Sequence, residues 1–105
     1  MIVRIWRTGL DESRADEYET FAYGRSLPMF QRQPGFRGVF FVRTATGRAS
    51  VTLWADLESA EALANAPEYH ETVAAIRSTG FLQSPQSVEL LPADKTWIAP
   101  DLTTP

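Results

Sequence analysis

The stretch FRGVFFVR, residues 36–43, decides the fold of this chain. Its aromatic and β-branched residues predict a strand. The segment TATGR (44–48) follows it and predicts a turn, in which Gly47 supplies freedom in φ. Next comes ASVTLWAD (49–56), whose composition predicts another strand. Two strands joined by a short turn predict a β-hairpin in the middle of the chain.

A strand and a helix are predicted before this hairpin. Residues 2–8 (IVRIWRT) predict a strand that Gly9 closes, and Asp11 is the predicted N-cap of the next helix. The helical pattern starts at Arg14. We expect the helix to kink or restart at Leu27-Pro28, because proline lacks an N–H and disfavours a helical residue before it.

A helix and a strand are predicted after the hairpin. Residues 59–66 are helical in composition, Pro67 interrupts them, and residues 68–79 continue with apolar side chains at helical spacing. Residues 86–91 (QSVELL) predict a last strand. The order β-α-β-β-α-β is that of the ferredoxin-like split βαβ fold. The expected fold class is therefore α+β, with a four-stranded antiparallel sheet and two helices on one of its faces.

Large apolar side chains occur on both faces of the predicted strands. In the first strand, we assign Val3, Ile5 and Arg7 to the face under the helices, and Arg4 and Trp6 to the opposite face. In the second strand, one face is predicted to carry Phe36, Phe40 and Val42, and the other Val39 and Phe41. An antiparallel sheet with helices on one side ordinarily has a polar second face.

The helices can cover only one of these two apolar faces. Burial of apolar surface is worth about 25 cal/mol per Å², so the uncovered face is expected to find a partner. A chain of 105 residues has no further segment to supply it. We therefore expect a homodimer in which two copies pack through their helix-free sheet faces.

Composition excludes several kinds of chemistry. The length of 105 residues indicates one domain, and a net charge of −3 provides no general attraction to nucleic acid or anionic membrane. Cysteine is absent, which excludes a thiolate nucleophile and cysteine-ligated metals. The single histidine, His70, cannot form a three-histidine metal site, so no metal site is predicted.

The two ends of the chain carry separate expectations. The N-terminal segment is interrupted by Arg4 and Arg7 and is too short and charged for a signal peptide or a membrane span, so cytoplasmic localisation is expected. Residues 1–91 are assigned to the folded domain and residues 92–105 to a Pro-rich tail. Trp97 belongs either to a frayed terminus or to an arm that docks on its own or the partner protomer.

Three sequence marks carry a family resemblance. They are QPGFRG (33–38) at the entry to the second strand, Leu53-Trp54 at the end of the third, and Tyr69 some fifteen residues later. With them, residues 1–91 resemble the antibiotic biosynthesis monooxygenase family of the dimeric α+β barrel superfamily. The resemblance implies a homodimer whose sheets close a barrel. It also implies a small aromatic or polyketide-like substrate, or haem, bound between sheet and helices, with oxygenase members needing neither metal nor flavin.

The haem-degrading branch of that family uses an Asn on the first strand, a Trp on the second helix and an axial His ten residues later. Aligned through Trp54 and Tyr69, these positions correspond to Arg7, Leu63 and Val73 here. All three residues differ, so haem degradation is not carried over and no cofactor is expected. The Asn and Trp associated with quinone-forming oxygenases are also not evident, which leaves oxygenation as an inference at family level.

Two residues are candidates for catalysis. Cofactor-free oxygenation requires a substrate held as an electron-rich anion, a stabilised charge and exclusion of water. Arg7 is expected to bind the anion from the helix-side face; the alternative is a surface ion pair at a strand end. Histidine is the side-chain type that ordinarily changes charge near neutral pH, so His70 is the candidate proton acceptor. The alternative for His70 is a solvent-facing or Glu-paired side chain.

Four further residues are predicted to bind the substrate. Trp54 and Tyr69 are expected to supply an apolar shelf. Tyr23 and Arg25 are expected to reach the cleft from the first helix near the restart at Pro28. The alternatives are a purely structural core role for Trp54 and half-exposed helix positions for Tyr23 and Arg25.

The predicted function is that of a cofactor-independent monooxygenase-like enzyme for a small aromatic or polyketide-like substrate. The alternatives are a non-oxidative isomerase, lyase or cyclase on the same fold, and a non-catalytic ligand-binding dimer. Residues 37–42 (RGVFFV) are similar to the RNP1 motif of RNA-recognition domains, which share this topology. That motif belongs on the third strand, whereas here it lies on the second, and the acidic balance weakens attraction to phosphate. Nucleic-acid binding is therefore the least favoured function.

Overall fold

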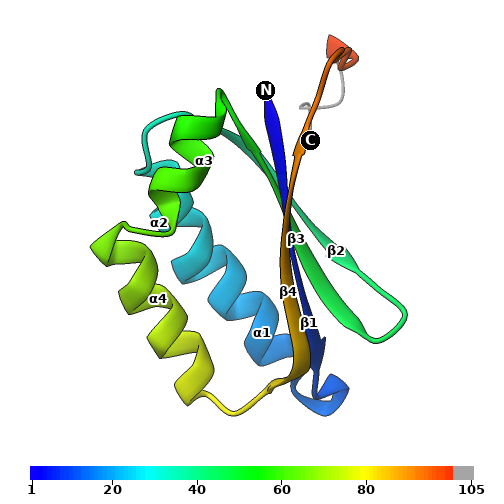
Figure 1. Ribbon diagram of the computed structural model, residues 1–105. Helices are drawn as coiled ribbons and strands as arrows, with labels where there is room; N and C mark the ends of the chain where they lie inside the picture. Colours follow the sequence, from blue (N-terminus) through cyan, green and yellow to red (C-terminus); the bar gives the residue numbers. More distant parts are fainter. Residues whose placement is uncertain (101–105) are drawn as a thin grey trace.

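The computed structural model describes residues 1–100 and consists of a four-stranded antiparallel sheet with helices on one of its faces (Figure 1). The strand order β2-β3-β1-β4 is that of the ferredoxin-like fold, as the sequence predicted. The elements, in chain order, are β1 (Ile2–Leu10), η1 (Glu12–Arg14), α1 (Ala15–Phe21), η2 (Ala22–Ser26), α2 (Leu27–Gln31), β2 (Phe36–Arg43), β3 (Gly47–Trp54), α3 (Leu57–Leu63), α4 (Pro67–Ser78) and β4 (Leu82–Pro92).

The predicted facing of β1 is wrong. Arg4 is buried and contacts Tyr69 of α4, so the even-numbered residues of β1 lie under the helices. Arg7 lies on the opposite, helix-free face, where it pairs with Glu89 of β4. Apolar side chains occur on both faces of this strand, so the alternation alone does not say which face is covered. Pairing with β3 decides it, because Arg4 lies opposite the fully buried Thr52.

The predicted facing of β2 is wrong at one residue. The pairing of β2 with β3 shifts register between Phe36 and Gly38. Such a bulge places one extra residue in the strand and changes which side chains share a face. Phe36 therefore packs into the core beside Trp54, whereas Phe40 lies on the helix-free face and is 46% exposed.

The first helical stretch changes its geometry along its length. Asp11 caps the short η1 helix by accepting a hydrogen bond from the Ser13 N–H at 3.1 Å, as its position before the helical pattern predicted. A π-helical turn, η2, separates α1 from α2. The helix restarts at Leu27 with Pro28 in its first turn, which confirms the predicted restart.

The second helical stretch is also divided in two. Asp56 caps α3 by accepting the Ser59 N–H at 2.8 Å. The longer α4 then starts at Pro67, where the sequence predicted an interruption. An ion pair of 3.0 Å between Arg32 and Glu68 joins the end of α2 to the first turn of α4. This contact fixes the start of α4, on which Tyr69 lies.

Two clusters of buried apolar residues hold the helices on the sheet. The first surrounds Trp54, which is 0% exposed and contacts the rings of Phe30 and Phe36. The second lies at the other end of β1 and includes Tyr18 and Phe81, whose rings meet edge to face. Burial in these clusters is the main force that joins the two layers.

The helix-free face of the sheet remains apolar and exposed. Its large exposed side chains are Phe40 and Val42 on β2 and Leu91 on β4. Half-buried aliphatic residues of β1 and β3 lie between them. Strand β4 begins four residues earlier than predicted, because Leu82 and Gln83 pair with the end of β1 beyond a register shift.

The chain beyond β4 runs away from the body. Trp97 is 84% exposed, so it does not pack on its own protomer. The end of the predicted tail, residues 101–105, lies outside the described residues. Within residues 1–100, no helix has the length and hydropathy that a membrane span requires.

Candidate functional site

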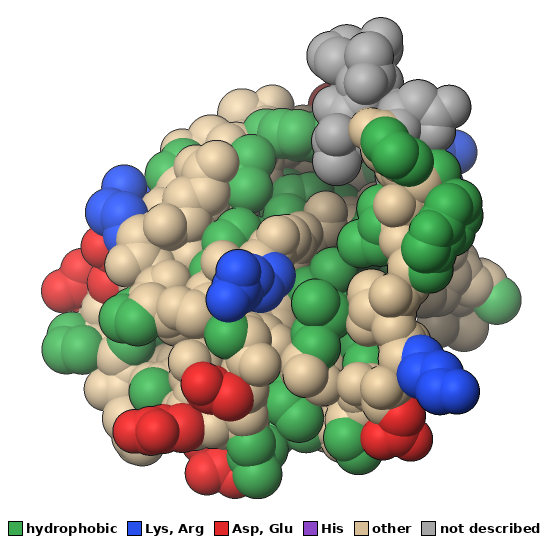
Figure 2. Space-filling model, turned by 90° about the horizontal axis from the view of Figure 1, so that it is seen from above, with side chains coloured by type: hydrophobic (Ala, Val, Ile, Leu, Met, Phe, Trp, Pro, Cys, Tyr) green, Lys and Arg blue, Asp and Glu red, His purple; other side chains and the backbone are tan. Residues whose placement is uncertain are grey.

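A cavity of about 270 Å³ lies between the sheet and the helices. It opens between the two core clusters, since Met29 of the first and Ile76 of the second both line it. Its lining residues are Arg4, Trp6, Ser26, Met29, Ser50, Tyr69, Thr72, Val73, Ile76, Arg77, Leu82, Gln86, Ser87 and Val88. In Figure 2, hydrophobic side chains lie between the helical layer and the sheet, while acidic ones lie at the periphery of this view.

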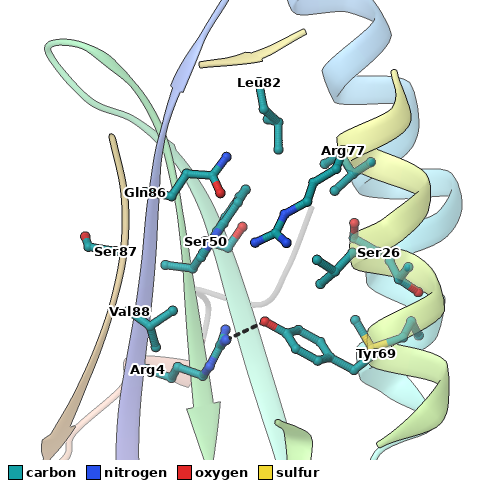
Figure 3. A pocket seen from close by; sticks show the side chains of 14 residues that line it. Arg4, Ser26, Ser50, Tyr69, Arg77, Leu82, Gln86, Ser87 and Val88 are labelled. Atoms are coloured by element: carbon teal, nitrogen blue, oxygen red, sulfur yellow. Dashed lines mark hydrogen bonds between the residues drawn. The ribbon is translucent and has the colours of Figure 1, made fainter. Parts of the chain in front are cut away.

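Arg4 is the buried polar group of this cavity. The residue is 5% exposed, and its Nη2 donates a hydrogen bond of 2.8 Å to the Tyr69 hydroxyl (Figure 3). The guanidinium carbon also lies 5.4 Å from the centre of the Tyr69 ring. Strand β1 and helix α4 therefore meet at a charged hydrogen bond, the stronger class of such bonds.

Trp54 and Thr52 support Arg4 from behind. The Trp54 indole N–H donates to the Thr52 hydroxyl at 2.8 Å. That hydroxyl in turn donates to the Arg4 carbonyl at 3.4 Å. The buried chain of bonds ties the backbone of β1 at Arg4 to β3 and so restricts the direction from which Arg4 enters the cavity.

Arg77 is the second cation of the cavity. It belongs to the last turn of α4, and Figure 3 shows its guanidinium extending from the helix toward the sheet, on the side of Ser50 and Gln86. Gln86 is held on the sheet side by a hydrogen bond of 3.2 Å from its Nε2 to the Thr8 hydroxyl. The two arginines therefore enter one cavity from opposite layers.

The charge of the cavity is unbalanced. No aspartate or glutamate lines it. The ion pairs within residues 1–100 use other arginines: Arg7, Arg14, Arg32 and Arg48. In the described part of the chain, neither Arg4 nor Arg77 thus has a carboxylate partner. Arg4 is buried, and a buried guanidinium without a counter-ion is costly, so an anionic ligand would offset that cost.

Tyr18 lies close to the cavity but does not line it. Burial raises the pKa of the Tyr18 hydroxyl above its usual value of 10.0, although a bond to Ser50 opposes the shift. The hydroxyl is therefore neutral at physiological pH. It supports the cavity wall and is not a base.

The two predicted catalytic residues lie outside the cavity. Arg7 is half exposed on the helix-free face and bonds Glu89 at 2.9 Å, which matches the surface ion pair considered as its alternative. His70 is exposed on α4, with its ring 5.8 Å from that of Tyr69. It follows Tyr69 directly, so the helical turn of about 100° per residue directs it away from the cavity.

Of the four predicted substrate-binding residues, the structure places one in the cavity. Tyr69 lines it and accepts the bond from Arg4. Trp54 is fully buried in the core, where its role is structural. Tyr23 is 68% exposed and packs on Phe41, while Arg25 is exposed and lies over the Phe21 ring. Neither Tyr23 nor Arg25 lines the cavity.

Sequence reasoning missed Arg4 and Arg77. Arg4 was missed because sequence reasoning places it on the face of β1 opposite the helices, whereas that residue lies under them. Arg77 carried no clear signal, because eight residues at about 100° per residue place it about 80° away from Tyr69 around the helix. The π-helical turn that contains Ser26 had no signal either.

Comparison with solved structures shows the fold of this chain in proteins of low sequence identity. The monooxygenase of the gene ActVA-Orf6 of Streptomyces coelicolor, in complex with nanaomycin D, superposes with a TM-score of 0.77 at 15% identity, over 93% of this chain and 91% of that one. A mutant of SnoaB, a cofactor-independent oxygenase from Streptomyces nogalater, gives 0.72 at 20% identity, over 90% and 94%. A mutant of MhuD with manganese protoporphyrin IX bound gives 0.75 at 20% identity, over 94% and 100%.

The chain has the fold of the antibiotic biosynthesis monooxygenases. The resemblance noted in the sequence is confirmed at this level. No family model matches the sequence, and no curated protein matches it either. The fold is therefore established, while activity has to be argued from the cavity.

One of these structures, the MhuD mutant, binds manganese protoporphyrin IX, an analogue of haem. An axial ligand for haem iron is a histidine, cysteine, methionine or tyrosine. The chain has no cysteine, and its single histidine, His70, does not line the cavity. The Tyr69 hydroxyl is bonded to Arg4, and Met29 is buried in the core cluster. The residues present do not fit an axially ligated haem.

Proposed function

We propose that this protein is a cofactor-independent monooxygenase-like enzyme that binds a small aromatic phenol or enol in the cavity between sheet and helices. The single observation that carries the proposal is the buried Arg4, which lines the cavity and has no carboxylate partner among the described residues. Such a group stabilises a phenolate or enolate oxygen inside a low-dielectric site.

The chemistry requires an anion that reacts directly with dioxygen. Arg4 stabilises the negative oxygen, which favours loss of the substrate proton and leaves an electron-rich ring system. In a phenol with a hydrogen on the ring carbon opposite the hydroxyl, one oxygen atom of O₂ becomes a carbonyl on that carbon, and the phenolic C–O becomes the second carbonyl of a quinone. The other oxygen atom leaves as water with the phenolic hydrogen and the hydrogen of that ring carbon. Atoms and electrons balance, so no external reductant is needed.

The lining supports this reaction in two further ways. Met29, Val73, Ile76, Leu82 and Val88 provide apolar contacts for a planar ring and reduce access of water to the anion. Tyr69 bonds Arg4 at 2.8 Å and so holds the guanidinium in a fixed direction. We assign Tyr69 to substrate positioning and give Arg4 the anion-binding role that sequence reasoning had assigned to Arg7.

The test is dioxygen consumption by the purified protein with a panel of electron-rich phenols and hydroxynaphthalenes. We expect uptake with the wild type and a loss of about a hundredfold in kcat/KM for Arg4→Gln. Arg43→Gln is the matched control, because Arg43 is an exposed residue at the end of β2 and does not line the cavity. Turnover without oxygen would instead indicate an isomerase, lyase or cyclase, and no uptake with any member of the panel would refute the oxygenase.

We further propose that the working form is a homodimer through the helix-free sheet face. Support comes from the exposed Phe40, Val42 and Leu91, which form an apolar surface on a face without helices. A second copy of the chain is the occupant with a matching apolar face, and two-fold pairing would cover both faces at once. The exposed Trp97 would then find its docking surface on the partner protomer.

A further inference from the structure

Arg77 is a cation that the proposed reaction does not use. Arg4 is enough to stabilise one phenolate oxygen, yet Arg77 enters the same cavity from the opposite layer (Figure 3). Within residues 1–100 it makes no hydrogen bond or ion pair to another side chain. Its guanidinium is thus available to a ligand in the cavity.

The cavity as a whole selects for negative charge. Its lining contains two arginines and no acidic residue, whereas the complete chain has a net charge of −3. A cleft lined by one sign of charge with low-dielectric walls concentrates ligands of the opposite sign. The excess of two positive charges corresponds to a ligand with two anionic oxygen centres rather than one.

The size and the remaining lining restrict the ligand further. A volume of about 270 Å³ lies just below the range of about 300–1,000 Å³ that is typical of pockets for drug-sized ligands. The side walls are apolar, and Ser50 and Gln86 supply neutral polar groups on the sheet side. A ligand of one or two rings with polar groups at separate edges satisfies these conditions.

We propose that the substrate is a hydroxyaryl carboxylic acid of one or two rings, in which Arg4 binds the ring oxygen and Arg77 binds the carboxylate. This inference rests on the proposed function, because it names the substrate class of that same site. The planar guanidinium fork of Arg77 matches a carboxylate with two parallel N–H···O bonds. A carboxylate is ionised at neutral pH, so it provides a permanent charge for recognition while the phenol is deprotonated only in the site.

The experiment is isothermal titration calorimetry of the protein at neutral pH with two matched pairs: para-hydroxybenzoate with para-hydroxybenzamide, and hydroxynaphthoate with hydroxynaphthamide. In each probe the hydroxyl and the carboxyl or amide group lie at opposite ends of the ring system. Naphthyl phosphate serves as the third kind of probe. The acid of each pair is expected to bind at least about tenfold more tightly than its amide, which is the effect of one charge-assisted contact. Raising the salt concentration should weaken binding of the acid more than that of the amide.

Variants at Arg77 locate the effect. Arg77 is exposed at the end of α4, so Arg77→Gln should fold normally. It is expected to weaken acid binding about tenfold and leave amide binding within about twofold. Arg77→Lys keeps the positive charge at the helix C-terminus but lacks the planar fork, so only part of the acid preference should return. Arg43→Gln should bind every probe like the wild type.

The inference would be overturned by two results: equal binding of acid and amide, or an equal loss of binding of both in Arg77→Gln. The proposed oxygenase function would then remain possible for neutral phenols. Tighter binding of naphthyl phosphate than of hydroxynaphthoate would overturn the carboxylate assignment. A clear acid preference that depends on Arg77, together with no oxygen consumption, would instead overturn the proposed reaction and support the inference.

Discussion

The hydrogen bond between Arg4 and Tyr69 orients the Arg4 side chain. The Tyr69 hydroxyl accepts the bond from the Arg4 side chain at 2.8 Å, and Arg4 is 5% exposed. A buried donor that loses its hydrogen-bond partner costs about 1–3 kcal/mol of stability. If the side chain can avoid this cost by moving, it no longer has a fixed direction. The direction of the guanidinium therefore depends on one phenolic oxygen.

Tyr69→Phe removes that oxygen and leaves the ring in place. We expect kcat/KM for oxygen consumption to fall about tenfold, since the loss of a hydrogen bond to a charged group corresponds to about 1.4 kcal/mol or more. Tyr23→Phe is the control, because Tyr23 is 68% exposed and does not line the cavity. Equal kinetics of the two variants would show that the Tyr69 hydroxyl has no role in positioning.

Asp56 provides a prediction about pH at the level of a single residue. Hydrogen bonds from Ser59 hold the pKa of the Asp56 carboxyl below its ordinary value of 3.8. A carboxylate with a lowered pKa stabilises the folded state above its unfolded pKa, and this stabilisation is lost as the pH falls through the folded pKa. Asp56 thus supports α3 at neutral pH and fails to do so in acid.

Asp56→Ala should lower the melting temperature by a few degrees at neutral pH. The difference from the wild type should shrink as the pH falls below about 4 and through the lowered pKa of Asp56, because the wild-type carboxyl then becomes protonated. Thermal melts recorded across this range check both statements. Asp56→Asn is the control, because its side chain keeps a capping oxygen that does not titrate. A difference between Asp56→Ala and the wild type that does not change with pH would contradict the assignment.

At the scale of elements, the turn before β2 sets how the helices approach the sheet. Gly35 has φ +80°, and its carbonyl accepts the Ala55 N–H at 2.8 Å, which joins the entry of β2 to the end of β3. A side chain at this position would overlap the Ser59 side chain of α3. Both the left-handed backbone and the close approach require glycine here.

Gly35→Ala should therefore destabilise the fold by about 2 kcal/mol or more, measured by chemical denaturation. Gly24→Ala is the matched control within the first helical stretch. A Cβ at Gly24 meets no atom within 4 Å, and alanine is the better helix former by about 1 kcal/mol. We expect Gly24→Ala to raise the free energy of unfolding, so a comparable loss in both variants would refute the explanation at Gly35.

At the scale of the whole molecule, the two faces of the sheet have different surroundings. One is covered by the helices and encloses the cavity, while the other exposes Phe40, Val42 and Leu91. Apolar surface of this kind is stabilised by association, at about 25 cal/mol per Å² buried. We therefore expect the second face to determine the oligomeric state.

Light scattering should give twice the chain mass of 11.8 kDa for the wild type. Phe40→Lys places a charge in the middle of the exposed face and should yield folded monomers of 11.8 kDa. Leu57→Lys is the control, because Leu57 is an exposed leucine on α3 in the helical layer. A wild type that is monomeric and folded at low concentration would refute the dimer.

The order of elements could be predicted from the sequence because it depends on local signals. The hairpin follows from two β-rich runs around Gly47, the restart of the first helix from Pro28, and its N-cap from Asp11. Each of these acts through the backbone within a few residues. They are sufficient for the β-α-β-β-α-β order and for the presence of two apolar sheet faces.

The composition of the cavity was decided only by the tertiary structure. Which face of β1 the helices cover depends on long-range pairing with β3, and a shift of one residue exchanges the two faces. That exchange moved Arg7 out of the site and brought in Arg4, with Arg77 joining it from another element. The physical reason is that a strand with apolar residues on both faces carries no local signal for which face becomes the interior.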